Sequence, residues 1–429
     1  MLLLKNTYLV NPYNSFEGLK DILIKDEHIE LIADNIDALD EWNVIDLEGK
    51  VTCPGFIDMH VHLREPGQEY KETIYDGCRA ALAGGFTGVA CMPNTKPVLD
   101  NDSIIEFVIN RAKYFNLASV YPIGAITKGQ EGKELAELLL MKEVGAVAFS
   151  DDGKTLANSG VMRRALDYVK SINGLIISHC EDKDLMGSGV IHEGEVSTKL
   201  GLAGIPSAVE EIIVDRDIRL AELTNSRIHI AHVSTAGSVE IIRRAKNKGV
   251  KVTAEVTPHH LLMNHEQIVN YDTNYKMNPP LRTKEDNEAL QQAFQDGVID
   301  CIVTDHAPHA LEEKRVEFDY APFGIVGLET AVPLIINHLY HKKKVNLLRI
   351  VEAFSTKPAQ ILGVEGGRIE SGVKADLTII DLELEKTVCP EDFYSKSVNT
   401  PFGGEKLKGW PVMTIKAGRI LMEKGEING

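Results

Sequence analysis

The segment GFIDMHVHLREPG, residues 55–67, is the starting point for predicting the fold. Its apolar run ends in His60 and His62, and Arg64 follows two residues later. Side chains alternate between the faces of a β-strand, so residues two apart project from the same side. If this run is a strand, both imidazoles point the same way from its C-terminal end and can bind one metal ion. A histidine pair in an exposed loop is the simpler alternative, so the interpretation depends on finding further ligands.

The composition is that of a large soluble globular protein. The chain has 429 residues, of which 44% are hydrophobic and 25% are charged, enough for one large barrel with a satellite domain. A net charge of −17 argues against nucleic acid and anionic membranes as partners. Neither a membrane span nor a signal peptide is expected from the apolar stretches. The six cysteines lack zinc-type or disulfide-type spacing, so free thiols in a reducing cytoplasm are expected.

Short apolar runs recur along the chain, separated by segments with helical spacing of apolar residues. Strands rich in Val, Ile and Ala that alternate with helices indicate a buried parallel sheet. Eight such units predict a closed (β/α)8 TIM barrel rather than an open sheet. The runs cover residues 55–62, 87–94, 119–127, 146–152, 174–180, 227–233, 251–260 and 300–306, and the helical segments include 103–115, 133–144, 161–172 and 208–224.

Both ends of the chain have the pattern of antiparallel β-structure. Residues 1–50 contain strand-like pieces joined by turns, and the C-terminal part contains ADLTIIDL and VMTIKAGRILMEKG, with a tight turn expected at 416–419. Neither end has enough apolar surface to fold alone. We therefore expect the two ends to pair into one small β-sandwich domain beside the barrel. The expected limits are 1–52 and 366–429 for the two parts of this domain and 53–365 for the barrel.

Polar side chains cluster where the predicted strands end. In a TIM barrel these C-terminal strand ends form the rim that carries the active site. Four histidines and two aspartates suit zinc or similar divalent ions. Six ligands are too many for one tetrahedral zinc ion with an open position, but they suit two ions that share a bridging carboxylate. The polar residues at the strand ends, from which these six ligands would come, are His60, His62, Asn94, Asp151, Asp152, His179, His232 and Asp305.

Taken together, the motifs resemble the dihydroorotase family, in particular its bacterial type I branch within the amidohydrolase superfamily. The resemblance covers nearly the whole chain, and the ordered set is far more specific than any single motif. It implies the reversible interconversion of N-carbamoyl-L-aspartate and L-dihydroorotate in pyrimidine (UMP) biosynthesis. The motifs are PGFIDMHVHLREPG, MPNT at 92–95, FSDDG at 149–153, ISH at 177–179, AHVST at 231–235, TPHH at 257–260, MNPPLR at 277–282 and TDHAPH at 304–309.

The resemblance implies two divalent metal ions per subunit, with zinc as the expected ion. His60, His62 and Asp305 would hold one ion, and His179 with His232 would hold the other. Asp305 would also be the general acid/base, a role that suits a carboxylate beside an activated water. Arg64 would bind the substrate carboxylate through two parallel hydrogen bonds. The implied substrate-binding residues are His62, Arg64, Asn94, Asn278, His309, Phe323 and Gly324, the last two through their backbone.

The ligand that bridges the two ions is expected to come from FSDDG. Alternation of side chains cannot choose between Asp151 and Asp152, because the strand ends there; the resemblance favours Asp152. Many similar amidohydrolases use a carboxylated lysine at this strand end. Here an aspartate already supplies two anionic oxygens, and Lys154 lies beyond a glycine that turns the chain. The sequence therefore predicts an aspartate bridge and an unmodified lysine.

The sequence leaves two alternative functions open, and it does not decide the roles of two histidines. A hydantoinase or allantoinase would share the fold and the metals, but hydantoinases accept substrates without the carboxylate that Arg64 and Asn94 would bind. A non-catalytic scaffold relative would have lost metal ligands that this chain retains. One of His259 and His260 could face the site, or both could be structural. The family further suggests a homodimer, sometimes associated with aspartate carbamoyltransferase.

Overall fold

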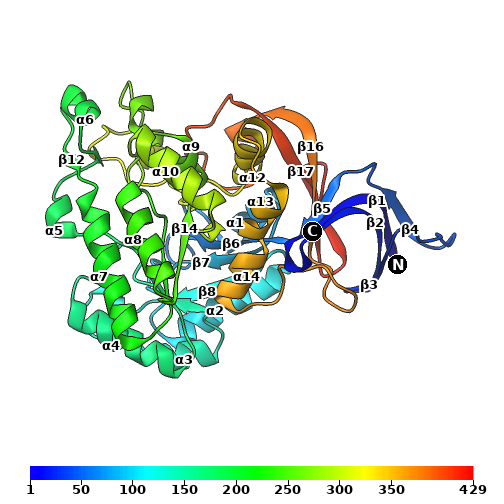
Figure 1. The fold of residues 1–429 in the computed structure, drawn as a ribbon, viewed down its shortest axis with the longest axis horizontal. Helices are drawn as coiled ribbons and strands as arrows, with labels where there is room; N and C mark the ends of the chain where they lie inside the picture. Colours follow the sequence, from blue (N-terminus) through cyan, green and yellow to red (C-terminus); the bar gives the residue numbers. More distant parts are fainter. Residues whose placement is uncertain (429) are drawn as a thin grey trace.

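Eight parallel strands form the barrel that the sequence predicts (Figure 1). In the computed structural model, which describes residues 1–428, hydrogen bonds link these strands in the order β15-β14-β13-β10-β9-β8-β7-β6. The two outer strands meet where Val61 pairs with His306 and the His62 amide donates to the His306 carbonyl at 2.8 Å. The strands are β6 (Phe56–Val61), β7 (Phe86–Cys91), β8 (Ser119–Gly124), β9 (Ala148–Phe149), β10 (Ile176–Ser178), β13 (Ile228–Ile230), β14 (Val252–Val256) and β15 (Cys301–Ile302).

Each predicted apolar run contains one barrel strand, but the strands are shorter than the runs. Two of them, β9 and β15, have only two residues each. Most of the polar residues that end the runs lie beyond the hydrogen-bond ladder, whereas His60 lies within β6. The strands themselves are buried. Many of their side chains pack in one cluster with those of the helices outside, and others, such as Ile57, Ile123 and Ile177, belong to a second cluster.

Helices cover the outside of the barrel (Figure 1). Several begin at a Ser, Thr or Asn side chain that accepts a hydrogen bond from the first turn, such as Thr73, Asn101 and Thr235. The larger helices are α1 (Ile74–Ala83), α2 (Asp102–Phe115), α4 (Ser159–Ser171), α7 (Ala208–Thr224), α8 (Ala236–Asn247), α10 (Lys284–Gln295) and α13 (Leu347–Phe354). Shorter ones are α3 (Leu138–Glu143), α5 (Lys183–Met186), α6 (Glu195–Leu200), α9 (Pro258–Leu262), α11 (Leu311–Lys314), α12 (Ala331–Ile335) and α14 (Thr356–Leu362).

The helix expected over 133–144 forms over only half of that length. Only α3 forms, because the chain before it pairs with residues 126–127 instead: Leu135 bridges to Thr127, and the Ala136 amide donates to the Ile126 carbonyl at 2.9 Å. The helix expected over 208–224 is found with those limits in α7.

Both chain ends form one sheet beside the barrel, as predicted. The order is β19-β18-β17-β16-β5-β1-β2-β3, with β4 beside β1, and the antiparallel pairing of β5 with β16 joins the two ends. The expected tight turn lies between β17 and β18, with positive φ at Ala417 and Gly418. Strand β5 crosses the expected limit at residue 52. The limits of the two domains stay a prediction. The strands are β1 (Leu2–Asn11), β2 (Phe16–Lys25), β3 (His28–Ala33), β4 (Asn43–Asp46), β5 (Val51–Pro54), β16 (Leu377–Thr387), β17 (Lys406–Lys416), β18 (Arg419–Glu423) and β19 (Glu426–Ile427).

A separate pair of short strands, β11 (Ile191–His192) and β12 (Gly204–Ile205), lies within the long connection between β10 and β13. Among residues 1–428, no helix has the length and apolar character needed to cross a membrane.

Candidate active site

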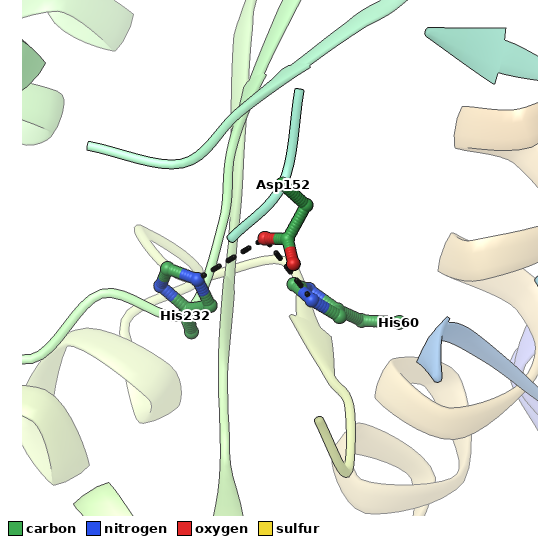
Figure 2. Close-up of side chains that lie close together, drawn as sticks. All are labelled: His60, Asp152 and His232. Carbon is green, nitrogen blue, oxygen red and sulfur yellow. Dashed lines mark ion pairs between the residues drawn. The ribbon is translucent and has the colours of Figure 1, made fainter. Parts of the chain in front are cut away.

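The strand ends bring the predicted metal ligands into one buried cluster. Figure 2 shows the Asp152 carboxylate facing His60 and His232. Its Oδ1 atom lies 3.4 Å from His60 Nε2, 3.6 Å from His232 Nε2 and 3.3 Å from His179 Nδ1. One carboxylate oxygen is thus surrounded by imidazoles from three different strand ends.

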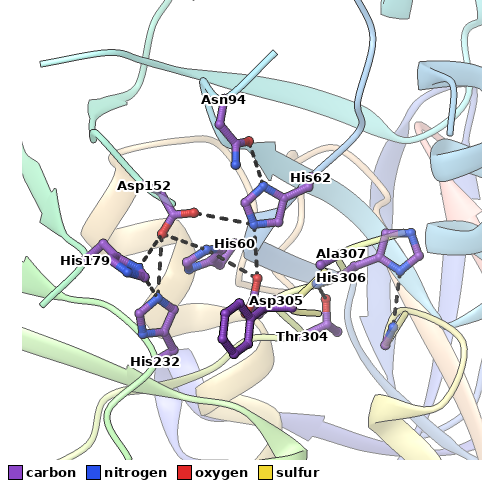
Figure 3. Close-up of polar contacts among 12 residues, drawn as sticks. His60, His62, Asn94, Asp152, His179, His232, Thr304, Asp305, His306 and Ala307 are labelled. Carbon is purple, nitrogen blue, oxygen red and sulfur yellow. Dashed lines mark hydrogen bonds and ion pairs between the residues drawn. The ribbon is translucent and has the colours of Figure 1, made fainter. Parts of the chain in front are cut away.

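The second oxygen of Asp152 points toward a different histidine (Figure 3). Asp152 Oδ2 lies 3.5 Å from His62 Nε2, and Asp305 Oδ1 lies 3.1 Å from that same nitrogen. Asp305 Oδ1 is also 3.6 Å from His60 Nε2. Two sets of three residues hold their ligand atoms within 4.8 Å of one another: His60 with Asp152 and His232, and His60 with His62 and Asp305. One oxygen of Asp152 therefore faces His60, His179 and His232, and the other faces His62.

The cluster contains buried polar atoms that lack hydrogen-bond partners within residues 1–428. These atoms are His60 Nε2, Asp152 Oδ1, His179 Nε2 and His232 Nδ1. A buried polar atom without a partner costs about 1–3 kcal/mol. Imidazole nitrogens and carboxylate oxygens are the donors that zinc and similar divalent ions prefer. The residues present therefore fit divalent metal ions.

The charges of the cluster are strongly coupled. Burial by itself lowers the pKa of His60, but the carboxylates of Asp152 and Glu255 raise that pKa well above its usual value. Burial raises the pKa of Asp152 and Asp305, yet the surrounding histidines hold both well below the usual range. Hydrogen bonds to Asp152 and Glu181 likewise raise the pKa of His179 to about 10, so without metal the imidazoles of His60 and His179 hold protons at neutral pH. Because a metal must displace these protons, metal affinity in such a site rises with pH.

Glu255 is a supporting residue that sequence reasoning missed. It lies in β14, fully buried, with Oε1 2.6 Å from His60 Nδ1 and Oε2 3.0 Å from His229 Nε2. Its Oε1 also accepts a hydrogen bond from the His232 amide at 3.2 Å. Such carboxylates orient a ligand imidazole and fix its tautomer. The signal was available, since a charged residue inside the apolar run KVTAEV is unusual for a buried strand.

The two aspartates of FSDDG have different surroundings. Asp151 Oδ1 accepts hydrogen bonds from the amides of Ile126 and Thr127 at 2.9 and 3.1 Å, and so ties down the loop after β8. Asp152 faces the histidines. Lys154 is exposed and lies beyond Gly153, which has a φ of 75°. Only Asp152 of this segment therefore reaches the cluster.

A cavity of about 180 Å³ opens onto the cluster. Buried Arg64 donates from Nε to the Pro308 carbonyl at 3.1 Å, and its Nη2 lies 3.5 Å from His309 Nε2. Burial lowers the pKa of Arg64 to about 10, so its guanidinium stays charged at neutral pH. His60 lies beneath the cavity and does not line it. The lining residues are His62, Arg64, Asn94, Asp152, Gly153, His179, His232, Asn278, Asp305, Ala307, His309, Phe323 and Gly324, so every residue expected to bind substrate is among them.

Hydrogen bonds orient the side chains of this pocket. Asn94 Oδ1 lies 2.8 Å from His62 Nδ1, which holds the other imidazole nitrogen toward Asp305. His309 Nε2 lies 2.8 Å from the Phe323 carbonyl and is therefore the protonated nitrogen. Asn278 donates from Nδ2 to Glu181. These contacts fix the tautomers that a ligand would meet.

The backbone at three site residues adopts a conformation that is uncommon outside glycine. Arg64, His232 and Asp305 have φ values of 63°, 30° and 47°. Such conformations cost about 1–3 kcal/mol each and cluster at functional sites. The turns that aim these side chains at the cavity are thus maintained against local strain.

The two histidines left open by the sequence differ in their contacts. His260 is bonded on both sides, with Nδ1 2.8 Å from Thr257 Oγ1 and Nε2 2.9 Å from the Pro279 carbonyl. These bonds assign His260 to the packing of α9. His259 is also buried and does not line the cavity.

Two family models and many full-length relatives match this chain. A family model described as dihydro-orotase-like matches residues 49–238, and one described as amidohydrolase family matches residues 224–422. A protein named dihydroorotase from Pelotomaculum thermopropionicum is 53% identical over 422 residues, which are 98% of each chain. Another from Acetivibrio thermocellus is 48% identical over 423 residues, which are 99% of each chain.

Solved structures with the same architecture carry other names. L-Hydantoinase (dihydropyrimidinase) from Arthrobacter aurescens has a TM-score of 0.90 at 25% identity and covers 100% of this chain and 97% of its own. D-Hydantoinase (dihydropyrimidinase) from Thermus sp. has a TM-score of 0.82 at 26% identity, with the same coverage. These likenesses confirm the predicted barrel with its accessory β-domain.

Proposed function

Since this chain belongs to the dihydroorotase family of cyclic amidohydrolases, we propose that it interconverts N-carbamoyl-L-aspartate and L-dihydroorotate in pyrimidine biosynthesis. The observation that carries the proposal is the shared cavity: the charged guanidinium of Arg64 and the His–Asp cluster open into the same space. A substrate carboxylate bound by Arg64 would be held beside the cluster. Full-length relatives at about half identity bear the dihydroorotase name, whereas the hydantoinase structures are 25–26% identical.

The cluster would hold two divalent metal ions, with zinc as the expected ion. His60, His62 and Asp305 would ligate one ion, His179 and His232 the other, and Asp152 both. Metal ions bound there would lower the pKa of a water molecule from about 15.7 toward about 7 and so supply a nucleophile at neutral pH. The donor types, their burial and their unpaired atoms support this assignment.

Asp305 would act as general acid/base in both directions. In ring opening, a bond forms between the attacking oxygen and the ring carbonyl carbon, and the amide C–N bond breaks. Asp305 would accept the proton from the attacking water and return it to the leaving nitrogen. The contact of its Oδ1 with His62 Nε2 at 3.1 Å holds the carboxylate in place at the cavity. As a ligand of the bound ion, Asp305 would start each ring opening unprotonated.

Arg64, Asn94, Asn278 and His309 would orient the substrate from the opposite wall, and the Phe323–Gly324 backbone would close the pocket. A guanidinium that binds a carboxylate through two parallel hydrogen bonds fixes orientation as well as affinity. Replacing Arg64 with Met leaves the substrate carboxylate unpaired, a loss of about 2–3 kcal/mol.

Assays of the metal-loaded protein with L-dihydroorotate, hydantoin and allantoin test the proposal. Dihydroorotate should be turned over in strong preference to the other two. Arg64→Met should reduce turnover of dihydroorotate far more than turnover of an analogue without the carboxylate. Equal losses on both substrates would make Arg64 structural, and preference for hydantoin would reassign the enzyme.

A homodimer in the cytoplasm, with aspartate carbamoyltransferase as a further partner, remains part of the proposal. The family resemblance supports the dimer and the partner. The cysteines support a reducing compartment, since all six are free thiols and five of them are buried. Sedimentation of the protein alone and with the carbamoyltransferase would test both assemblies.

A further inference from the structure

Asn399 reaches the substrate pocket from the C-terminal part of the chain. It lies between β16 and β17, in the stretch SKSVNTPFGGE. Its side chain is buried behind the cavity and makes three hydrogen bonds. Oδ1 accepts from the His309 amide at 3.1 Å, and Nδ2 donates to the carbonyls of Ala307 and Gly324, each at 3.1 Å.

The three partners all line the cavity. They belong to two wall segments: residues 307–309, which follow β15 beyond Asp305 (Figure 3 labels Ala307), and residues 323–326. The walls also touch each other, since the Ala307 amide donates to the Ile325 carbonyl at 2.8 Å. In addition, the Asn399 carbonyl accepts from the Val326 amide at 2.9 Å. A single residue from a distant part of the chain thus connects both walls.

The spacing of the walls is tight. Gly324 has a φ of 123°, and a Cβ atom there would lie only 2.6 Å from Ala307 Cβ. His309 reaches back across this gap, with Nε2 2.8 Å from the Phe323 carbonyl. A small shift of either wall would therefore move both the His309 imidazole and the Gly324 backbone, which a substrate would contact.

The side-chain amide of Asn399 supplies the donors and the acceptor that this position requires. An asparagine has two donors on nitrogen and one acceptor oxygen, and here each has a partner. Aspartate has the same shape, but it would place an anionic oxygen against two carbonyl oxygens. The Gly324 carbonyl keeps a second donor in Lys314 Nζ at 3.1 Å, whereas Lys314 makes no contact with His309. Asn399 thus links the Gly324 carbonyl to the His309 amide.

We propose that Asn399 is a positioning residue for substrate recognition, which sets the spacing of His309 and the Gly324 backbone across the pocket. This inference rests on the proposed function, because His309 and Gly324 are taken to bind substrate. Asn399 contacts none of the cluster residues in its hydrogen bonds, so it should affect substrate binding and leave metal binding intact.

Kinetics of Asn399→Asp test the proposal. Loss of two buried hydrogen bonds should raise KM for L-dihydroorotate by about tenfold or more, with kcat changed by less than about threefold and metal content unchanged. Asn11→Asp is the matched control. Asn11 is equally buried in the small sheet, donates to the Ile369 carbonyl at 2.8 Å and accepts from the Ile369 amide, so its variant should lose stability without a change in KM.

Hydrogen exchange gives a reading that does not require activity. Asn399→Asp should speed exchange of the backbone amides in 307–309 and 323–326, and Asn11→Asp should leave both segments unchanged. Failure of the wild-type protein to act on dihydroorotate would refute the proposed function, while exchange still reports whether Asn399 holds the walls. Unchanged KM and exchange would overturn the inference. If Asn399→Asp does not fold, Asn399→Ser replaces it, and failure of both to fold would assign the residue to global stability.

Discussion

Replacing Glu255 with Gln should weaken metal binding without removing any ligand. The Glu255 carboxylate receives the Nδ1–H of His60 at 2.6 Å and faces His229 Nε2 at 3.0 Å. Glutamine keeps one oxygen for His60 but turns an NH2 group toward His229. His229 can adapt by changing its tautomer, because its Nδ1 faces the Thr253 hydroxyl, which can donate or accept. The main effect of the substitution is the loss of the negative charge of Glu255 beside His60.

The expected loss of metal affinity follows from these contacts. Changes of this kind typically cost 10- to 100-fold in metal affinity. Because Glu255→Gln retains the acceptor for His60, we expect about tenfold, or about 1.4 kcal/mol. Glu255→Ala leaves His60 Nδ1 without a buried partner and should approach the upper value of about 100-fold.

Competition with a calibrated chelator at fixed pH measures the zinc affinity of each variant. Asp21→Asn is the control, since Asp21 is an equally buried carboxylate in the small sheet that accepts from the amides of Asn6 and Ile36. It should lose stability and keep its zinc affinity. Equal affinity in wild-type protein and both Glu255 variants would refute the reasoning that this carboxylate supports a ligand.

Four further substitutions probe three other features, two of them in the site and one in the packing of α9. Asp305→Asn should lower turnover by about 10²–10⁴-fold with metal partly retained, and near-normal turnover would remove Asp305 from the mechanism. Lys154→Ala should keep two metal ions and Asp152→Ala should lose at least one, with reconstitution indifferent to bicarbonate; metal loss in the lysine variant would point to a carboxylated lysine instead. Burial lowers the pKa of His260 to about 3, so its stabilising contribution is complete above pH 6.5 and is lost as the pH falls. The drop in the free energy of unfolding from pH 7 to pH 5, measured by urea denaturation, should therefore be about 2 kcal/mol smaller in His260→Gln than in the wild-type protein.

The barrel was predictable because its signals are local. Each strand is a short apolar run, and each run ends in a polar residue whose position along the chain marks the rim. His60 and His62 could be assigned to one side of a strand from alternation alone. The pairing of the two chain ends was also predictable, because neither end could bury its apolar face by itself. The helix expected over 133–144 was wrong for half of its length, since Leu135 and Ala136 pair with the loop after β8, a contact that sequence spacing does not reveal.

The supporting residues were harder to predict, because their roles depend on contacts between distant parts of the chain. Glu255 meets His60 across 195 residues, and Asn399 meets His309 across 90. Alternation could not separate Asp151 from Asp152 at the end of a strand. Their different environments come from the backbone amides of residues 126 and 127, which bind Asp151 and leave Asp152 to face the histidines.

Zinc titration of the chelator-stripped protein, followed by hydrolysis of L-dihydroorotate, tests the central claim most directly. The proposal of a binuclear site with Asp152 as the bridge predicts negligible activity in the stripped protein. Activity should rise with added zinc and reach its plateau at two equivalents per chain. Full activity in the stripped protein, or a plateau at one equivalent, would contradict the account.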